Sequence, residues 1–182
     1  MLYLENAKKI GGWMSDAELL TLARLAQDSQ SIIEVGSYQG RSTAVLADNI
    51  QYGGVVYAVD PWDCPNYNNN GQISFVTDDT TRHIFYCNLY QHIENGTVIM
   101  VPRKFIDVPL RTIHEPDVIF IDGDHRYQSV KDDIHHAIAF NPRFITGHDY
   151  APEWPDVIKA VHEVIGKENI EVINSLWICK LR

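Results

Sequence analysis

The sequence predicts an α/β protein with a doubly wound, mostly parallel sheet of seven strands and a C-terminal antiparallel hairpin. Short apolar runs alternate with segments of helical apolar spacing along the chain, and strands that alternate with helices form parallel sheets covered on both faces. The last two apolar runs are separated only by Asn174 and Ser175. A two-residue connection joins strands as an antiparallel pair.

The elements follow in order from this pattern. Ser15 offers an N-cap hydroxyl ahead of the first helix, because its oxygen can accept from a free amide of the first turn. Strands are expected at residues 31–35, 55–59, 97–101, 117–121, 143–146, 170–173 and 176–179. Helices are expected at residues 17–26, 40–50, 76–94, 127–139 and 155–166. The length predicts one domain over residues 1–182.

Composition restricts the classes of partner. Lys and Arg number 15 and Asp and Glu number 24, so the net charge at pH 7 is −9, which disfavours bulk nucleic-acid binding. No apolar stretch approaches the ~20 residues of a membrane helix, and the N-terminus lacks a secretory signal pattern. The three cysteines form no C-x-x-C pair, so no disulfide framework or structural zinc site is indicated. A cytoplasmic enzyme without a membrane partner is expected.

The segment from Ile32 to Thr43 is the most informative part of the chain. It reads as an apolar strand, a turn that contains Gly36 and Gly40, and the start of a helix. A residue without Cβ lets a ligand approach the main chain closely. Asp60 ends the next apolar run, and an acid about 20 residues past such a turn is placed to hold ribose hydroxyls. The combination predicts an adenosine-containing cofactor.

Charge favours S-adenosylmethionine over a dinucleotide. Tyr38 stands where the G-x-G-x-x-G pattern needs its middle glycine. Glu34, before the turn, would repel a pyrophosphate but could attract a cation directly or through water. S-adenosylmethionine carries an ammonium and a sulfonium and no phosphate. A side chain at Gly36 is expected to block this cofactor and to leave the fold largely intact.

Three ordered motifs resemble the signatures of a known family. The stretch E-V-G-S-Y-Q-G-R-S-T, from Glu34, and V-Y-A-V-D, ending at Asp60, resemble motif I and the following acid of class I S-adenosylmethionine-dependent methyltransferases. The stretches at 118–125 and 145–150 resemble the F-I-D-G-D-H and G-H-D-Y signatures of that family's small O-methyltransferase-like group. The resemblance covers residues 13–150 and implies a Rossmann-like methyltransferase fold and methyl transfer to oxygen.

The cofactor site is expected around the glycine turn. The expected cofactor-binding residues are Glu34, Gly36, Ser37, Tyr38, Gly40, Asp60, Trp62 and Asp122. Trp62 belongs to a loop at residues 61–71 that is rich in turn formers. Because strand carboxyl ends line the ligand crevice of such sheets, this loop is expected over the adenosine or the substrate, with Trp62 near the adenine. The alternative is an ordinary surface excursion.

Acids and histidines follow two neighbouring strands. Asp122 ends a buried apolar strand, where a charge needs a partner or a ligand, and Asp124 and His125 follow within one turn. His148 and Asp149 end the next strand, so all five are expected at one rim of the sheet. Oxygen ligands on an open rim suit Mg²⁺, and such an ion could bind a substrate hydroxyl and lower its pKa.

The resemblance also implies a metal set and a base. Metal-dependent O-methyltransferases that the chain resembles use positions matched here by Asp122, His148 and Asp149. The histidine departs from the acid of that pattern, which admits Mn²⁺ or Fe²⁺, or no metal. Asp124, His125 and His148 compete as the catalytic base: related sugar O-methyltransferases have an aspartate at the position of Asp124, whereas a histidine titrates nearer neutrality. The alternative is that D-G-D-H only shapes a turn and caps the next helix.

Residues outside this group receive other roles. Arg41 is expected to contact a substrate carboxylate or to pair with Asp48 or Glu34. Asp132 and Asp133, on the helix at 127–139, are expected to be solvated surface charges.

The primary prediction is an S-adenosylmethionine-dependent methyltransferase that acts on a hydroxyl of a small polar acceptor, such as a sugar or another metabolite. A divalent metal, Mg²⁺ or Mn²⁺, would assist if the acidic rim binds one. One alternative is a metal-dependent hydroxylase or hydrolase that uses Asp122, His148 and Asp149, and another is a non-catalytic module that only binds S-adenosylmethionine. A homodimer is a further expectation, because a second subunit could complete the pocket.

Overall fold

The computed structural model describes residues 2–63, 65–67, 73–113 and 115–182. The main sheet has seven strands in the order β5-β2-β1-β6-β7-β9-β8, which confirms the α/β prediction. Its parallel pairs join β5, β2, β1, β6 and β7 in turn, whereas β9 runs antiparallel to β7 and to β8. The strand bounds are β1 Ser31–Val35, β2 Val55–Val59, β5 Val98–Val101, β6 Val118–Ile121, β7 Phe144–Gly147, β8 Glu171–Ile173 and β9 Leu176–Lys180.

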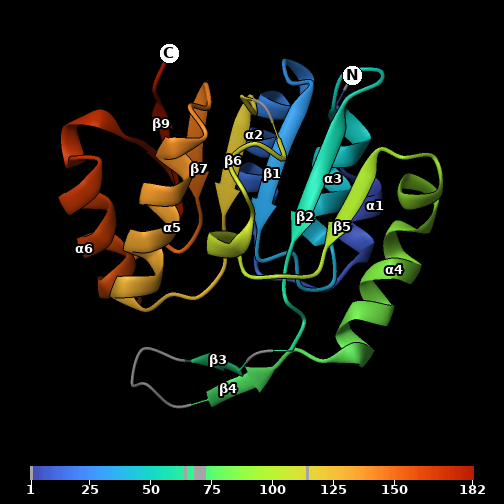
Figure 1. The fold of residues 1–182 in the computed structure, drawn as a ribbon, viewed down its shortest axis with the longest axis horizontal. Helices are drawn as coiled ribbons and strands as arrows, with labels where there is room; N and C mark the ends of the chain where they lie inside the picture. Colours follow the sequence, from blue (N-terminus) through green and yellow to red (C-terminus); the bar gives the residue numbers. More distant parts are fainter. Residues whose placement is uncertain (1, 64, 68–72, 114) are drawn as a thin grey trace.

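Helices cover both faces of this sheet (Figure 1). One core layer contains Leu22 and Leu46, from α2 and α3, and the other contains Ile134 and Val161, from α5 and α6. The central strand β6 is buried along its whole length, as a parallel strand between two helical layers must be. The helix bounds are α1 Glu5–Lys9, α2 Asp16–Gln27, α3 Arg41–Asn49, α4 Asp79–Glu94, α5 Tyr127–Ala139 and α6 Pro155–Val164, with short 3-10 turns at Phe105–Asp107 and Lys167–Asn169.

The segment after β2 departs from the prediction. It forms a small antiparallel pair, β3 (Pro65–Tyr67) with β4 (Ile73–Val76), that projects from the carboxyl ends of the parallel strands (Figure 1). The helix expected from residue 76 therefore begins at Asp79, with the Asp78 carboxylate accepting from the Thr81 amide at 3.0 Å. Most of the asparagine run of the expected 61–71 loop lies outside the described residues.

Two further observations concern the helices. The helix α1 was not predicted, because five residues are too few for a clear apolar period. Across the described ranges, none of the helices combines the length and apolarity that a bilayer crossing requires.

Candidate active site

A cavity of about 830 Å³ lies at the carboxyl ends of the parallel strands. The residues that follow β1, β2, β6 and β7 all contribute to its wall, and the connection between α1 and α2 closes one side. This is the place where doubly wound sheets bind ligands. The predicted site residues on this wall are Gly36, Ser37, Tyr38, Asp60, Asp122, Asp124, His125, His148 and Asp149.

The turn after β1 fits tightly against the loop after β6. Gly36 has φ +84, and a Cβ built on it would lie 2.1 Å from the carbonyl oxygen of Asp122. The expectation that a side chain here would leave the fold largely intact is therefore wrong. The glycine is required first by the contact between two loops and only then by any ligand.

Asp60 holds the same turn in place. Its Oδ2 accepts from the amides of Ser37 and Tyr38 at 3.0 and 2.9 Å, and its Oδ1 accepts from the amide of Trp62 at 2.7 Å. The side chain is buried, and burial raises its pKa. Asp60 borders the cavity, so the predicted ribose contact stays a prediction beside this structural role.

Three predicted cofactor residues lie behind the wall and do not line the cavity. Glu34 is fully buried, accepts from the Thr43 hydroxyl, and has a pKa raised to about 7 by burial. Gly40 has φ +92, and an added Cβ would meet Leu89 of α4 at 2.2 Å. The Trp62 ring packs on Phe85, with centroids 5.0 Å apart. The Trp62 ring therefore lies in the core, where a large apolar ring is better buried, and its predicted contact with the adenine stays a prediction.

Arg41 bonds to main-chain carbonyls and not to Asp48 or Glu34, whereas its predicted contact with a substrate carboxylate stays a prediction, because Arg41 borders the cavity. Its guanidinium donates to the carbonyls of Ile10 and Met14 at 2.9 and 3.1 Å. These bonds hold the α1–α2 connection over the glycine turn, where the exposed Trp13 ring lies against Tyr38 with centroids 5.4 Å apart. The N-terminal segment is thus a fixed wall of the cavity.

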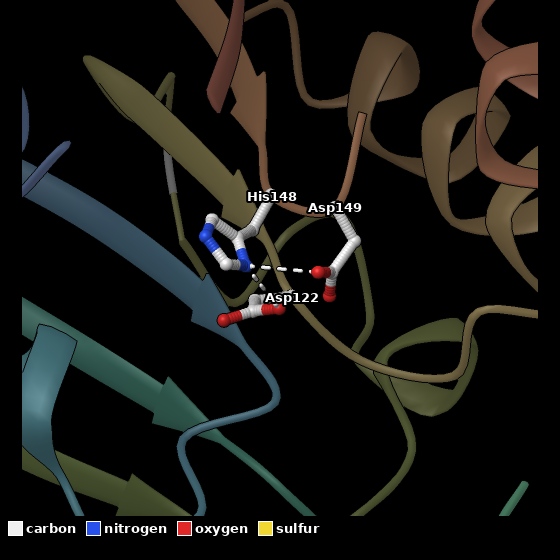
Figure 2. A group of neighbouring side chains, drawn as sticks. All are labelled: Asp122, His148 and Asp149. Carbon is white, nitrogen blue, oxygen red and sulfur yellow. Dashed lines mark ion pairs between the residues drawn. The ribbon is translucent and has the colours of Figure 1, made fainter. Parts of the chain in front are cut away.

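The acids and the histidine after β6 and β7 meet as predicted. Figure 2 shows His148 directed at the carboxylates of Asp122 and Asp149. Its Nδ1 lies 3.7 Å from Asp122 Oδ1 and 3.4 Å from Asp149 Oδ1. One ligand atom from each of the three residues lies within 4.8 Å of the others. Asp149 reaches this position with φ +57, a conformation that aspartate tolerates better than most residues.

A second histidine completes the charge pattern. His125 Nε2 lies 2.7 Å from Asp149 Oδ2, and its ring packs against Trp154 at a tilt of 34°, with centroids 4.4 Å apart. Burial alone would lower the pKa of His125, but the carboxylates of Asp122 and Asp149 raise it to about 10. A protonated imidazole cannot accept a proton, so this structure does not favour His125 as the base.

The far side of His148 contacts residues that the sequence did not single out. Its Nε2 lies 3.1 Å from Ser175 Oγ and 3.4 Å from Glu18 Oε1. Burial would lower the pKa of His148, but the charges of Asp122, Asp149 and Glu18 raise it to about 9. The pattern S-D-A-E at Ser15 is a capping-box signal that could have drawn attention to Glu18, although not to its contact with His148.

Asp124 is engaged with its own loop. It accepts from the amide and the side chain of Arg126 and from the Ser129 hydroxyl at 3.0 Å. Burial alone would raise the pKa of Asp124, but the Arg126 hydrogen bonds hold it below the usual value. These hydrogen bonds favour a role for Asp124 in shaping the turn after β6 over a role as the catalytic base.

Asp133 contradicts its predicted role as a solvated surface charge. It borders the cavity from α5, beneath Gly123. Burial, together with the charges of Asp124 and Asp132, raises the pKa of Asp133 to about 7. The helical period alone did not show that the loop after β6 covers this face of α5.

Comparison with known proteins agrees with this geometry. A family model described as a methyltransferase domain matches residues 33–150. A protein of Acanthamoeba polyphaga mimivirus, described as uncharacterized, is 24% identical over 143 residues, which are 76% of this chain. The chain spans 61% of that relative's length.

Solved structures share the fold at low sequence identity. An O-methyltransferase from Bacillus cereus in complex with SAH has a TM-score of 0.66 and 16% identity, with 97% of this chain and 87% of that one covered. The O-methyltransferase TomG from Streptomyces achromogenes, in complex with SAM, has a TM-score of 0.65 and 13% identity, with 93% and 82% covered. Likeness at this identity shows the fold.

Proposed function

Because the chain belongs to the methyltransferase-domain family, we propose that it transfers a methyl group from S-adenosylmethionine to a hydroxyl of a small polar acceptor. A divalent cation at the cavity rim would assist. One observation carries the proposal: the glycine turn and the Asp122, His148 and Asp149 cluster border the same cavity. A cofactor on the turn and an acceptor at the cluster would then be neighbours, as direct displacement requires.

The turn after β1 supports the cofactor assignment. Gly36, Ser37 and Tyr38 line the cavity, and two of their amides are already held by Asp60, so the turn is fixed in place before any ligand arrives. The solved O-methyltransferases with the same fold include complexes with SAM and with SAH. The volume of about 830 Å³ leaves space for an acceptor beside the cofactor.

The donor atoms of the rim fit a divalent cation. Two carboxylates face the Nδ1 of His148, and a lone pair on Nδ1 would be repelled by both unless a positive charge lay between them. In the absence of a metal a proton on Nδ1, additional to the one on Nε2, supplies that charge, because the pKa of His148 is raised to about 9. Asp122, His148 and Asp149 would hold a metal in its place, and the metal would lower the pKa of a bound hydroxyl.

The other charged groups would orient the reactants. Asp149 Oδ2 is engaged by His125, which leaves Oδ1 directed at the cluster. With Asp124 held by Arg126 and His125 charged, we assign neither as the base. The cation would instead make the bound hydroxyl more acidic, and its proton would pass to solvent water.

Calorimetric titration of the metal-stripped protein with S-adenosylmethionine, with and without Mn²⁺ or Mg²⁺, tests both halves of this proposal. Cofactor binding in the micromolar range and a separate heat for the metal alone are expected. No cofactor binding under any metal condition would refute the methyltransferase assignment. Cofactor binding without any metal heat would refute only the role of the cation.

The imidazole in the donor set favours one second candidate. His148 suits transition metals better than Mg²⁺, so a metal-dependent hydroxylase or hydrolase on the same fold would use the same three residues. Tight Fe²⁺ or Mn²⁺ binding together with no affinity for S-adenosylmethionine would favour this candidate over methyl transfer.

A further inference from the structure

A buried carboxylate lies directly behind His148. Glu18, in the first turn of α2, is only 3% exposed. Its Oε2 accepts from the amide and hydroxyl of Ser15 at 2.7 and 2.8 Å, and its Oε1 accepts from the amide and hydroxyl of Ser175 at 2.9 and 2.6 Å. Four donors therefore surround the two oxygens of Glu18, which is the environment of a carboxylate that only accepts.

The hydrogen bonds around Glu18 determine which nitrogen of His148 carries a proton. The Ser175 hydroxyl gives its proton to Glu18, so its oxygen is left to accept from His148 Nε2 at 3.1 Å. Glu18 Oε1 lies 3.4 Å from the same nitrogen. Both neighbours are acceptors toward the ring, and a proton on Nε2 satisfies them. The other nitrogen, Nδ1, faces Asp122 and Asp149 (Figure 2).

We propose that Glu18 is a positioning residue which, through Ser175, keeps the proton of His148 on Nε2 and so commits Nδ1 to the cation at the rim. The inference rests on the proposed function only in that a cation binds there. It links three distant segments, because α2, the end of β7 and the turn between β8 and β9 meet at one imidazole. Metal-bound histidines commonly donate their second N–H to such a partner, which orients the ring.

A purely structural role makes a different prediction. Glu18 also closes the capping box of α2 with Ser15, so replacing it lowers stability in either case. A structural role would leave the coordination of His148 unchanged in any variant that still folds. Ser15 provides the control, because its hydroxyl donates to Oε2, away from His148, and accepts from the side chain of Asn174 but not from Ser175. Its loss costs about 1 kcal/mol of helix stability.

Binding of Zn²⁺ without S-adenosylmethionine is the first measurement, by competition with a chromophoric chelator. Glu18→Gln and Ser175→Ala are each expected to weaken Zn²⁺ binding by about 10- to 100-fold, whereas Ser15→Ala should stay within about twofold of the parent protein. Ser175→Ala keeps the amide bond to Glu18 and the capping box, so it remains informative if Glu18→Gln does not fold.

The ring nitrogens of His148 provide the second measurement. Long-range ¹H–¹⁵N correlation of the Zn²⁺-loaded, ¹⁵N-histidine-labelled protein, assigned with His148→Gln, should show metal on Nδ1 and a proton on Nε2. Metal on Nε2 would overturn the inference. Equal losses of Zn²⁺ affinity in Glu18→Gln, Ser175→Ala and Ser15→Ala would also overturn it. If Asp149→Asn abolishes Zn²⁺ binding while Glu18→Gln and Ser175→Ala do not weaken it, the inference fails and the proposed metal site stands. If the parent protein binds no metal, the inference and the proposed metal site both fail.

Discussion

Replacing Gly36 by alanine should destabilise the protein more than the same replacement at Gly53. Both glycines have positive φ, at +84 and +79, so both variants incur the cost of a left-handed alanine. They differ in space: an added Cβ at Gly36 would lie 2.1 Å from the Asp122 carbonyl oxygen, whereas at Gly53 it meets nothing within 4 Å. Comparison of the two variants therefore separates the energetic cost of backbone strain from that of the steric collision.

The expected magnitudes follow from these two costs. A left-handed conformation costs a non-glycine residue about 1–2 kcal/mol, of which about 0.4–1 kcal/mol is recovered because alanine restricts the unfolded chain. Gly53→Ala should therefore cost about 1 kcal/mol. The collision at Gly36 forces the loop after β6 to move and adds about 1–3 kcal/mol, which brings that variant to roughly 2–4 kcal/mol.

Urea unfolding, followed by circular dichroism on both variants without ligand, measures this difference. Thermal unfolding should agree, since each kcal/mol lowers the Tm of a chain of this size by about 2–4 °C. Equal losses at the two positions would refute the reasoning, because the close approach of the turn to Asp122 would then carry no energetic weight.

Three other perturbations test separate parts of the structure. Arg41→Met keeps the apolar stem but removes the two bonds to the α1–α2 connection, so proteolysis of residues 1–15 should accelerate severalfold, and an unchanged rate would count against a fixed wall. Asp149→Asn keeps a residue that tolerates φ +57 but should weaken Mn²⁺ binding at least tenfold in calorimetry, and retained affinity would remove Asp149 from the ligand set. The pKa of Glu34 is raised on folding, from 4.5 to about 7, so its contribution to stability is full below about pH 4.5 and is lost as the pH rises through 7. Glu34→Gln should remove that part of the pH dependence, on the order of 3 kcal/mol between pH 4.5 and 8, and identical pH profiles of unfolding for variant and parent would disprove the shift.

The family prediction from the three motifs is confirmed by the match over residues 33–150. The same motifs located the rim, because Asp122 and the pair His148 and Asp149 end strands that are adjacent in the sheet. The prediction that these three side chains lie close together needed only the assumption that the two parallel strands are neighbours in the sheet.

The orientations that the sequence did not predict share a physical cause. Trp62, Gly40 and Glu34 belong to the segments expected at the cofactor, yet their side chains or Cβ positions face the core layer against α4 and α3. Arg41 was expected at a substrate carboxylate or beside Asp48 or Glu34, whereas in the structure it bonds to carbonyls about 30 residues earlier. Local pattern shows that a residue is near the ligand crevice, but which way it points depends on what packs behind it.

The sequence by itself determined the alternation of strands and helices, the glycine turn with Asp60 beyond it, and the acids that end β6 and β7, because each depends on chemistry within a few residues. The tertiary structure decided the rest. Ser175 lies 157 residues after Glu18 and 27 residues after His148, yet its hydroxyl contacts both side chains. Such contacts form only when helices and strands are packed together, because local periodicity does not show which distant side chains will lie beside each other in the core.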